Sequence, residues 1–308
     1  MKKVLSLIIL CAFSIHAYPQ EIKERRVYYL DCSYSMKTNG IWDDVRENLK
    51  KAIDNINDER TELIVIPFAD NPSPNPTLKP MVGYATSAGK EKLKSQIDAL
   101  PMNKNTMTYH YIPLNDFYNH RVNEKLVTYM FLMTDGQDED SQQRTLKQLL
   151  PQWGSKYGNS QVYGFYVMLH NQAMNSAIDK VVKKQDHLWI VEKANVNVNL
   201  IRLETSAIYN AKNEDNFNIK ILSGDVSGKT FDCNFPANCP YSVRKTEVIL
   251  NQLKVWVQKP SGQKLPENAN YILSIKMNNR EEFDFLVTEK IPVQCEYKPE
   301  RSLKITVR

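Results

Sequence analysis

A regular alternation of apolar runs with amphipathic segments fills residues 27–195 and limits what this part of the chain can fold into. The apolar runs are four to eight residues long, as buried strands are, and they lie at 27–30, 63–68, 126–133, 162–169 and 187–191, with 81–85 as a short edge strand. Strands that are apolar on both faces need helices on both sides of their sheet. The pattern therefore predicts a doubly wound, mostly parallel α/β sheet of Rossmann-like type.

The segments between these runs carry the helical spacing of apolar residues. Residues 43–56 place their apolar side chains on one face, and a second helix is expected after Ser87, with Pro101 as its stop. Asp140 is expected to cap a third helix, with Gln143 at the capping-box position, and Asn171 to open a fourth.

The helical pattern stops near residue 198. The rest of the chain holds short alternating segments separated by turn residues such as Gly224, and we expect strands at 218–222, 253–257, 271–276, 283–287 and 303–307. This spacing predicts an antiparallel β-sandwich, immunoglobulin-like, over residues 199–308, after an α/β domain over residues 18–198.

The amino-terminus has the layout of a secretory signal peptide over residues 1–17. Lys2 and Lys3 precede a short apolar stretch, and Ala17 offers a small residue for cleavage. The stretch is too short to span a bilayer comfortably. We therefore expect an exported mature chain without a transmembrane segment, in the periplasm or at the cell surface.

Export places the cysteines where disulfides persist. Cys32 lies in an apolar strand end and is expected to be a buried free thiol. The connectivity among Cys233, Cys239 and Cys295 stays open, with a local bridge between Cys233 and Cys239 as one arrangement.

Composition and motifs argue against two other classes of protein. The 40 basic and 35 acidic residues give a net charge of +5 without a dense Lys/Arg stripe, so we expect no nucleic-acid partner. The sequence has no Gly-x-Ser-x-Gly elbow, no His-Glu-x-x-His and no P-loop, which argues against the enzyme classes those motifs mark.

Two carboxylates occur where predicted strands end. Asp31 closes the first strand, and Asp135 follows the strand at 126–133. Ligands of open parallel sheets bind beyond the carboxyl ends of strands, so the two side chains face one crevice if their strands are neighbours. Ser33 and Ser35 follow Asp31 at alternate positions and add two hydroxyl oxygens. Such oxygens suit a hard divalent cation, and Mg²⁺ uses only one or two carboxylates.

These residues resemble a known site. Residues 27–36, VYYLDCSYSM, are similar to the first part of the metal-ion-dependent adhesion site of von Willebrand factor A domains, whose pattern is Asp-x-Ser-x-Ser. Residues 131–136, FLMTDG, resemble its last part. The family places a threonine between them, on a loop entering a helix; Thr106 fits that loop best and Thr108 is the alternative, although the usual Gly-Gly is missing. The resemblance covers roughly residues 25–198.

The resemblance implies a metal site and a way of using it. The implied ligands are Asp31, Ser33, Ser35, Thr106 and Asp135. Mg²⁺ is the expected ion, with Mn²⁺ and Ca²⁺ as alternatives, and a protein partner would supply a carboxylate to the open position. The chain is then an exported binding or adhesion module and not an enzyme.

Two other functions remain as alternatives. In one, the chain is a structural subunit of an envelope complex, with the β-sandwich as its main contact surface. In the other, Asp31 is the nucleophile of a metal-dependent hydrolase, although Ser33 stands where such enzymes usually have a second Asp. Several nearby residues also admit two interpretations. The acidic residues at 138–140 are either a solvated helix start or a second ion site, and Tyr34, Tyr109 and Tyr111 either contact a partner or pack internally. His110 is expected to be exposed or in the core.

Overall fold

The chain divides into two compact units, Met1–Val196 and Asn197–Arg308, which are described separately below. The predicted signal peptide and the predicted strand at 303–307 lie outside the described residues. The computed structural model describes residues 21–69, 79–101, 107–135, 138–169, 176–191, 198–261, 265–281 and 283–297.

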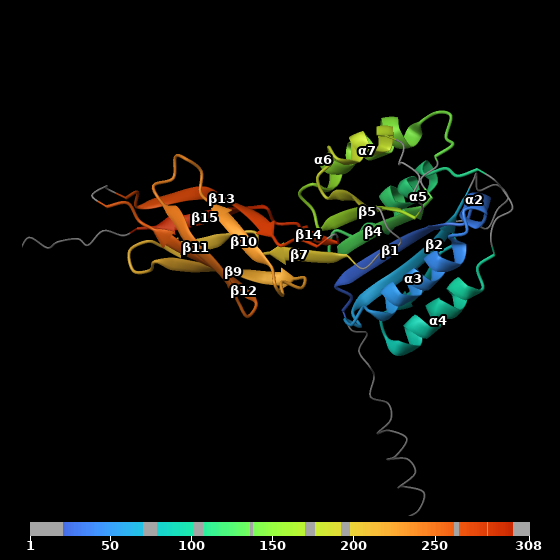
Figure 1. The fold of residues 1–308 in the computed structure, drawn as a ribbon, viewed down its shortest axis with the longest axis horizontal. Helices are drawn as coiled ribbons and strands as arrows, with labels where there is room; N and C mark the ends of the chain where they lie inside the picture. Colours follow the sequence, from blue (N-terminus) through green and yellow to red (C-terminus); the bar gives the residue numbers. More distant parts are fainter. Residues whose placement is uncertain are drawn as a thin grey trace, which may run out of the picture. The chain divides into compact units, whose positions relative to one another are not determined.

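The described residues of the first unit form a six-stranded sheet in the order β3-β2-β1-β4-β5-β6 (Figure 1). All neighbouring pairs are parallel except β2 with β3, so the sheet is mixed, with one antiparallel edge. This is the doubly wound arrangement predicted from the alternation. The strands are β1 (Glu24–Asp31), β2 (Thr61–Phe68), β3 (Met81–Tyr84), β4 (Val127–Thr134), β5 (Val162–Met168) and β6 (Leu188–Val191).

Helices cover both faces of this sheet. Figure 1 shows α3 and α4 on one side, with α5, α6 and α7 on the other. No helix in the described part of the chain has both the length and the apolar character needed to cross a bilayer. The helices are α2 (Tyr34–Thr38), α3 (Trp42–Asp54), α4 (Ser87–Asp98), α5 (Tyr111–Asp116), α6 (Trp153–Tyr157) and α7 (Ser176–Val182), with π-helical turns at Phe117–Arg121 and Thr145–Leu149 and a 3₁₀ turn at Leu150–Gln152.

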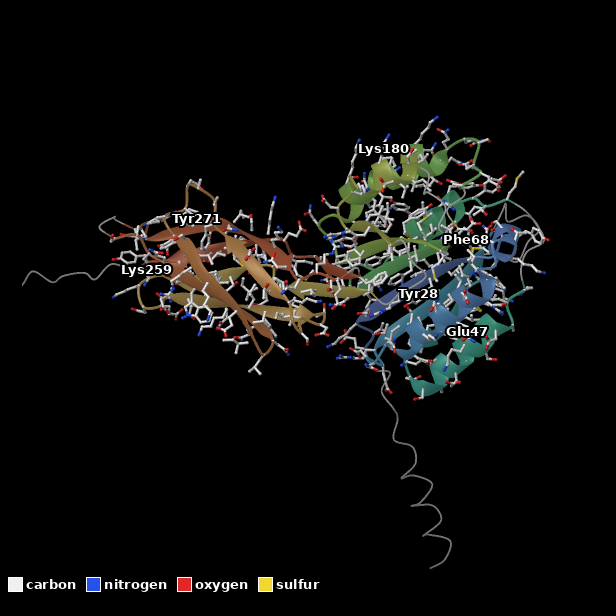
Figure 2. All side chains as sticks on the ribbon, in the orientation of Figure 1. Tyr28, Glu47, Phe68, Lys180, Lys259 and Tyr271 are labelled. Carbon is white, nitrogen blue, oxygen red and sulfur yellow. The ribbon has the colours of Figure 1, made fainter. Side chains whose placement is uncertain are left out.

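Side chains alternate along each central strand and so supply both layers of the core. Tyr29 on β1 packs in the layer that contains Phe117 and Trp153, from the side of α5 and α6. Tyr28, the preceding residue, instead stacks on Phe131 of β4, with ring centroids 4.8 Å apart. Figure 2 shows Tyr28 at the sheet and Glu47 and Lys180 on the helices outside it.

Two predicted helix starts are corrected by the structure. The cap of α4 is Thr86, whose hydroxyl accepts a hydrogen bond from the Gly89 amide, and Ser87 is the first residue of the helix. After Asp140 no regular helix begins, because Gln143 has a φ of 53° and cannot occupy a capping box. Short π, 3₁₀ and α segments follow in place of the single predicted helix, with Pro151 inside the 3₁₀ turn. The predicted helix start at Asn171 lies outside the described residues.

The second unit contains two sheets, in the orders β10-β13-β15-β8 and β11-β12-β9-β7-β14. Most pairs are antiparallel, but β7 pairs with β14 and β8 with β15 in parallel, so the sheets are mixed rather than purely antiparallel. The strands are β7 (Asn199–Leu203), β8 (Ala207–Asn210), β9 (Asn216–Ser223), β10 (Thr230–Asn234), β11 (Ser242–Ile249), β12 (Gln252–Gln258), β13 (Asn268–Asn278), β14 (Asp284–Leu286) and β15 (Lys290–Glu296).

Both sheets contribute to one core. Ile219 of β9 and Val255 of β12 belong to the same buried cluster as Leu273 of β13 and Val293 of β15. The polar residues between these positions face outward, which is the period-two pattern expected of strands that bury one face.

The described cysteines form no disulfide. Cys32 is buried and free, as predicted. Cys233, Cys239 and Cys295 are also free thiols, so the structure does not contain the local bridge between Cys233 and Cys239.

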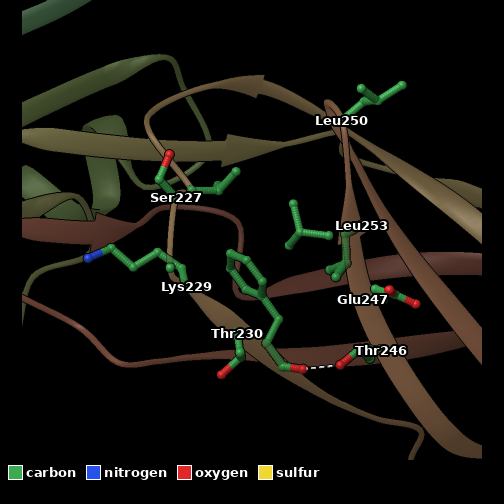
Figure 3. A pocket seen from close by; sticks show the side chains of 11 residues that line it. Ser227, Lys229, Thr230, Thr246, Glu247, Leu250 and Leu253 are labelled. Atoms are coloured by element: carbon green, nitrogen blue, oxygen red, sulfur yellow. Dashed lines mark hydrogen bonds between the residues drawn. The ribbon is translucent and has the colours of Figure 1, made fainter.

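The tip of the β11–β12 hairpin carries an unusual residue. Leu250 has a φ of 54° and 90% of its side chain is exposed. Leucine rarely adopts this left-handed conformation, which asparagine and glycine tolerate. Beside the hairpin lies a hollow of about 420 Å³ whose lining includes Leu253 and Lys229 (Figure 3).

We expect Leu250→Asn to stabilise the chain by about 0.5–1 kcal/mol. Asparagine tolerates the left-handed backbone better than leucine, and the exposed Leu250 side chain buries little apolar area that the substitution could remove. Urea denaturation of the full chain measures this change. Ile208→Asn is the control, since Ile208 is exposed but lies in β8 with ordinary strand geometry. A Leu250→Asn variant that unfolds at lower urea than the parent would contradict the assignment of strain.

Candidate metal centre

The candidate site lies where the strand order of the first sheet reverses. Chain connections run outward from β1 on one side and from β4 on the other, so the loops after these two strands diverge and leave a crevice at their carboxyl ends. Leu30 pairs with Met133, which places Asp31 and Thr134 at the same level of the sheet. The ends of β1 and β4 are therefore neighbours, as predicted.

Asp31 is fully buried, and its carboxylate is held from two directions. Oδ1 accepts a hydrogen bond of 2.9 Å from the Ser33 amide. Oδ2 accepts one of 2.8 Å from the Thr134 hydroxyl. The carboxylate plane is thus fixed by one donor from its own loop and one from the neighbouring strand.

Ser33 and Ser35 present their hydroxyls side by side, with the two Oγ atoms 2.8 Å apart. Only the first of the two serines has the expected extended backbone. Ser33 has extended geometry, but Ser35 lies in the first turn of α2. The two oxygens still converge, because the change from extended to helical backbone falls between them.

Asp135 is buried, and its Oδ2 accepts a hydrogen bond of 3.3 Å from the Asn39 amide group. Asn39 ends α2, so this bond joins the loop after β1 to the loop after β4. Burial, and secondly the negative charge of Asp135, raise the pKa of Asp31 from 3.8 to about 7. The charge of Asp31 is therefore disfavoured by its burial and by a nearby like charge, in a place with little water to screen it.

The threonine loop is described only in part. Thr106 lies outside the described residues. Thr108, the alternative, is buried and exchanges two hydrogen bonds with Glu139: its amide donates to Oε2 at 2.8 Å, and its carbonyl accepts from the Glu139 amide at 2.9 Å. The His110 amide likewise donates to Asp138 Oδ1 at 3.2 Å. These two acidic residues therefore hold the threonine segment against the loop after Asp135, a role that neither earlier interpretation included.

Of the other residues expected near the site, Asp140 and Tyr111 make internal contacts and Tyr34 is exposed. Asp140 forms an ion pair with Arg144, whose guanidinium also lies 3.4 Å from the ring centre of Tyr111. Tyr111 is thus occupied by an internal contact. Tyr34 remains 43% exposed between the two serines, and Met107 is 48% exposed beside Thr108. Tyr34 is therefore an aromatic side chain of this site that a partner can reach.

The residues present fit a hard divalent cation. Two buried carboxylates and two adjacent hydroxyls form an all-oxygen set, which Mg²⁺ and similar ions prefer. The described residues contain no group of three or more His, Cys, Asp or Glu side chains placed to hold a metal ion. A cation would also compensate the burial and the neighbouring negative charge that together raise the pKa of Asp31.

Several residues of the site were not predicted from the sequence. Thr134 immediately precedes Asp135 in the quoted Thr-Asp-Gly run, and this position was the one available signal for its contact with Asp31. Asn39, Tyr166 and the buried His110 gave none, because their contacts join segments far apart in the chain.

The sequence pattern of the von Willebrand factor type A domain matches residues 27–204, more than half of the chain. The chain belongs to this family. No curated protein sequence matches it.

Among solved structures, the chain is similar to the von Willebrand factor type A protein of Catenulispora acidiphila, at 13% identity and a TM-score of 0.42, over 82% of this chain and 62% of that one. It is also similar to proximal thread matrix protein 1 from the mussel byssus, at 15% identity and a TM-score of 0.40, over 57% of this chain and 44% of that one. A third is the pilus adhesin SpaC of Lactobacillus rhamnosus GG, at 12% identity and a TM-score of 0.40, over 89% and 43%. The chain thus spans less than half the length of the mussel protein and of the adhesin.

The raised pKa of Asp31 predicts a pH dependence of the metal-free protein. Folding raises the pKa of this acid from 3.8 to about 7, so the folded state holds the extra proton between these values. Stability from Asp31 is then fully present below about pH 4 and is lost progressively as the pH rises to about 7, a change on the order of 4 kcal/mol. The measurement is urea denaturation in chelator across this range, comparing wild type with Asp31→Asn.

The difference between the two proteins isolates Asp31 from the other titrating groups. We expect the wild type to lose stability relative to Asp31→Asn as the pH increases. Parallel curves for the two proteins would show that Asp31 does not carry the raised pKa.

Proposed function

We propose that this chain is an exported binding module that uses a divalent cation, held at the carboxyl edge of its first sheet, to engage an acidic group of a protein partner. Asp31, Ser33, Ser35 and Asp135 would hold the ion, with Thr106, or Thr108 in its place, as a further ligand. The cation supplies a positive charge with an open position, and the carboxylate of a partner completes its shell.

One observation carries this proposal. Asp31 and Asp135 are two buried carboxylates whose charges oppose each other, and the serine hydroxyls converge beside them. Buried like charges are costly unless a counter-charge compensates them. A divalent ion largely neutralises two carboxylates, yet it still attracts an additional anionic ligand.

Mg²⁺ is the ion we propose, with Mn²⁺ or Ca²⁺ as alternatives. The site offers few charged ligands and several neutral ones, which suits an ion that keeps part of its water shell. The mussel protein was also solved with zinc occupying its metal-ion-dependent adhesion site.

The other parts of the chain have separate roles in this proposal. We propose that residues 1–17 are a signal peptide, that the binding domain extends over 18–198, and that residues 199–308 form an immunoglobulin-like β-sandwich that presents it. The mature chain would then act in the periplasm or at the cell surface, without a nucleic-acid partner.

The first test is binding of the metal alone. Mg²⁺ or Mn²⁺ should bind the purified protein and raise its melting temperature by linkage, because only the folded state assembles the ligands. Asp31→Ala should abolish both effects. Calorimetry that detects no binding of either ion to the wild type would contradict the proposal.

The second test separates metal binding from folding. Replacing Ser33 and Ser35 together with Ala removes two neutral oxygens, so the variant should keep the melting temperature of the metal-free wild type. It should lose Mg²⁺-dependent capture of the partner from the native source, which chelator also abolishes in the wild type.

The matched control replaces Ser155 and Ser160, whose hydroxyls bond only to local carbonyls in the same unit. This variant should capture the partner like the wild type. Equal capture by the Ser33/Ser35 variant, or capture that survives chelation, would contradict a metal-mediated contact. Turnover of phosphate or acyl esters that disappears in Asp31→Asn would instead establish the hydrolase alternative.

The second candidate function, a structural subunit that binds through its β-sheets, is favoured by one observation. Leu250 is a strained, 90% exposed leucine at a hairpin tip, beside the hollow of Figure 3. A residue that is unfavourable for folding there is understandable if it contacts a partner. The same capture experiment distinguishes the two functions: for this one, capture is unaffected by chelator and is lost in Leu250→Asn.

A further inference from the structure

A chain of buried hydrogen bonds runs to Asp31 from Tyr166, which lies in the core layer that contains Tyr29. The Tyr166 hydroxyl, on β5, bonds to Nδ1 of His110. His110 Nε2 lies 3.1 Å from the Thr134 hydroxyl, at the end of β4. Thr134 in turn donates to Asp31 Oδ2 at 2.8 Å. All four side chains are buried, and they come from three strands and from the segment just before α5.

The direction of each bond follows from the number of protons available. Thr134 has one hydroxyl proton, which it gives to Asp31, so it must accept a proton from His110 Nε2. His110 Nδ1 is then the acceptor for the Tyr166 hydroxyl. Burial raises the pKa of Tyr166 well above its usual value, so this hydroxyl keeps its proton. Every bond therefore points towards Asp31, and such aligned bonds strengthen one another.

His110 is held in one orientation by its surroundings. Its ring makes edge contacts with Phe68, at a centroid distance of 6.4 Å, and with Tyr166, at 5.5 Å. Its backbone amide donates to Asp138. The imidazole therefore has fixed contacts with two rings and with the loop after Asp135, and its Nε2 stays aimed at Thr134.

We propose that Tyr166, His110 and Thr134 form a positioning relay that fixes the orientation of the Asp31 carboxylate towards the cation, with His110 as the Nε2-protonated tautomer. This inference rests on the proposed function. Partners of metal ligands commonly act this way, since they set the direction in which a ligand presents its lone pairs.

Packing alone does not account for these residues. Apolar side chains would fill the same volume without the desolvation cost of a hydroxyl and an imidazole. The same unit contains a contrasting case: the hydroxyl of Tyr157 is buried and has no hydrogen-bond partner among the described residues. Tyr166 therefore differs from Tyr157 in what its hydroxyl does, which makes the pair a matched comparison.

The experiment measures the affinity of the full chain for Mn²⁺ by calorimetry, together with its melting temperature in chelator. We expect His110→Leu and Tyr166→Phe to weaken Mn²⁺ binding, His110→Leu by about 10- to 100-fold. His110→Gln should recover most of that loss, because its amide can still donate to Thr134. Tyr157→Phe should bind Mn²⁺ like the wild type.

Nitrogen NMR of the imidazole gives a readout that a purely structural role would not move. The His110 signal, identified by its loss in His110→Gln, should show a proton on Nε2 in the wild type and in Tyr166→Phe, and the Nδ1 resonance should shift in Tyr166→Phe because that nitrogen loses its donor. A proton found on Nδ1 in the wild type would overturn the relay.

The outcomes separate the two levels of inference. If the wild type binds no Mn²⁺, the proposed function fails and the relay fails with it. If the wild type binds but His110→Leu and Tyr166→Phe bind equally well, only the relay is overturned. A loss in His110→Leu that His110→Gln does not recover, with a matching fall in the melting temperature in chelator, assigns these residues to folding and also overturns it.

Discussion

The burial of two carboxylates where the strand order reverses is the constraint on which the rest of this site depends. Asp31 is fully buried and next to Asp135, so its charge has little water and an unfavourable neighbour. Hydrogen-bond donors around the two carboxylates offset part of this cost. The Ser33 amide and the Thr134 hydroxyl donate to Asp31, and Asn39 donates to Asp135. These donors are dipoles and leave the net charge unchanged, which is why a cation is the natural complement of the site.

Much of this arrangement could be predicted from the sequence, because its signals are local. Strands that are apolar on both faces identify a sheet covered on both sides, and the residues that follow them identify its carboxyl edge. Asp31 is the last residue of β1 and Asp135 directly follows β4. The two side chains therefore lie close together once β1 and β4 are adjacent in the sheet. The same local reasoning failed for Gln143, where a left-handed backbone interrupts the expected helix.

The rest could not be predicted, because it depends on contacts between distant segments. Tyr166 and His110 are far apart in sequence and appear as an ordinary strand tyrosine and an isolated histidine. In the second unit, β11 has a mostly exposed pattern with no clear alternation, and β8 has only four residues. The parallel pairs at β7–β14 and β8–β15 also need strands distant in sequence to meet, which no turn signal between them specifies.

The geometry of the site is relevant to the choice between binding and hydrolysis. Both oxygens of Asp31 accept hydrogen bonds, which fix the orientation of its fully buried carboxylate. A nucleophilic serine would need a base within reach. Ser33 and Ser35 instead bond to each other, and Nε2 of His110, the buried histidine of the site, points at Thr134. The basic groups are thus committed to orienting Asp31. Such an arrangement favours a rigid ligand set for an ion over a group that must move during a reaction.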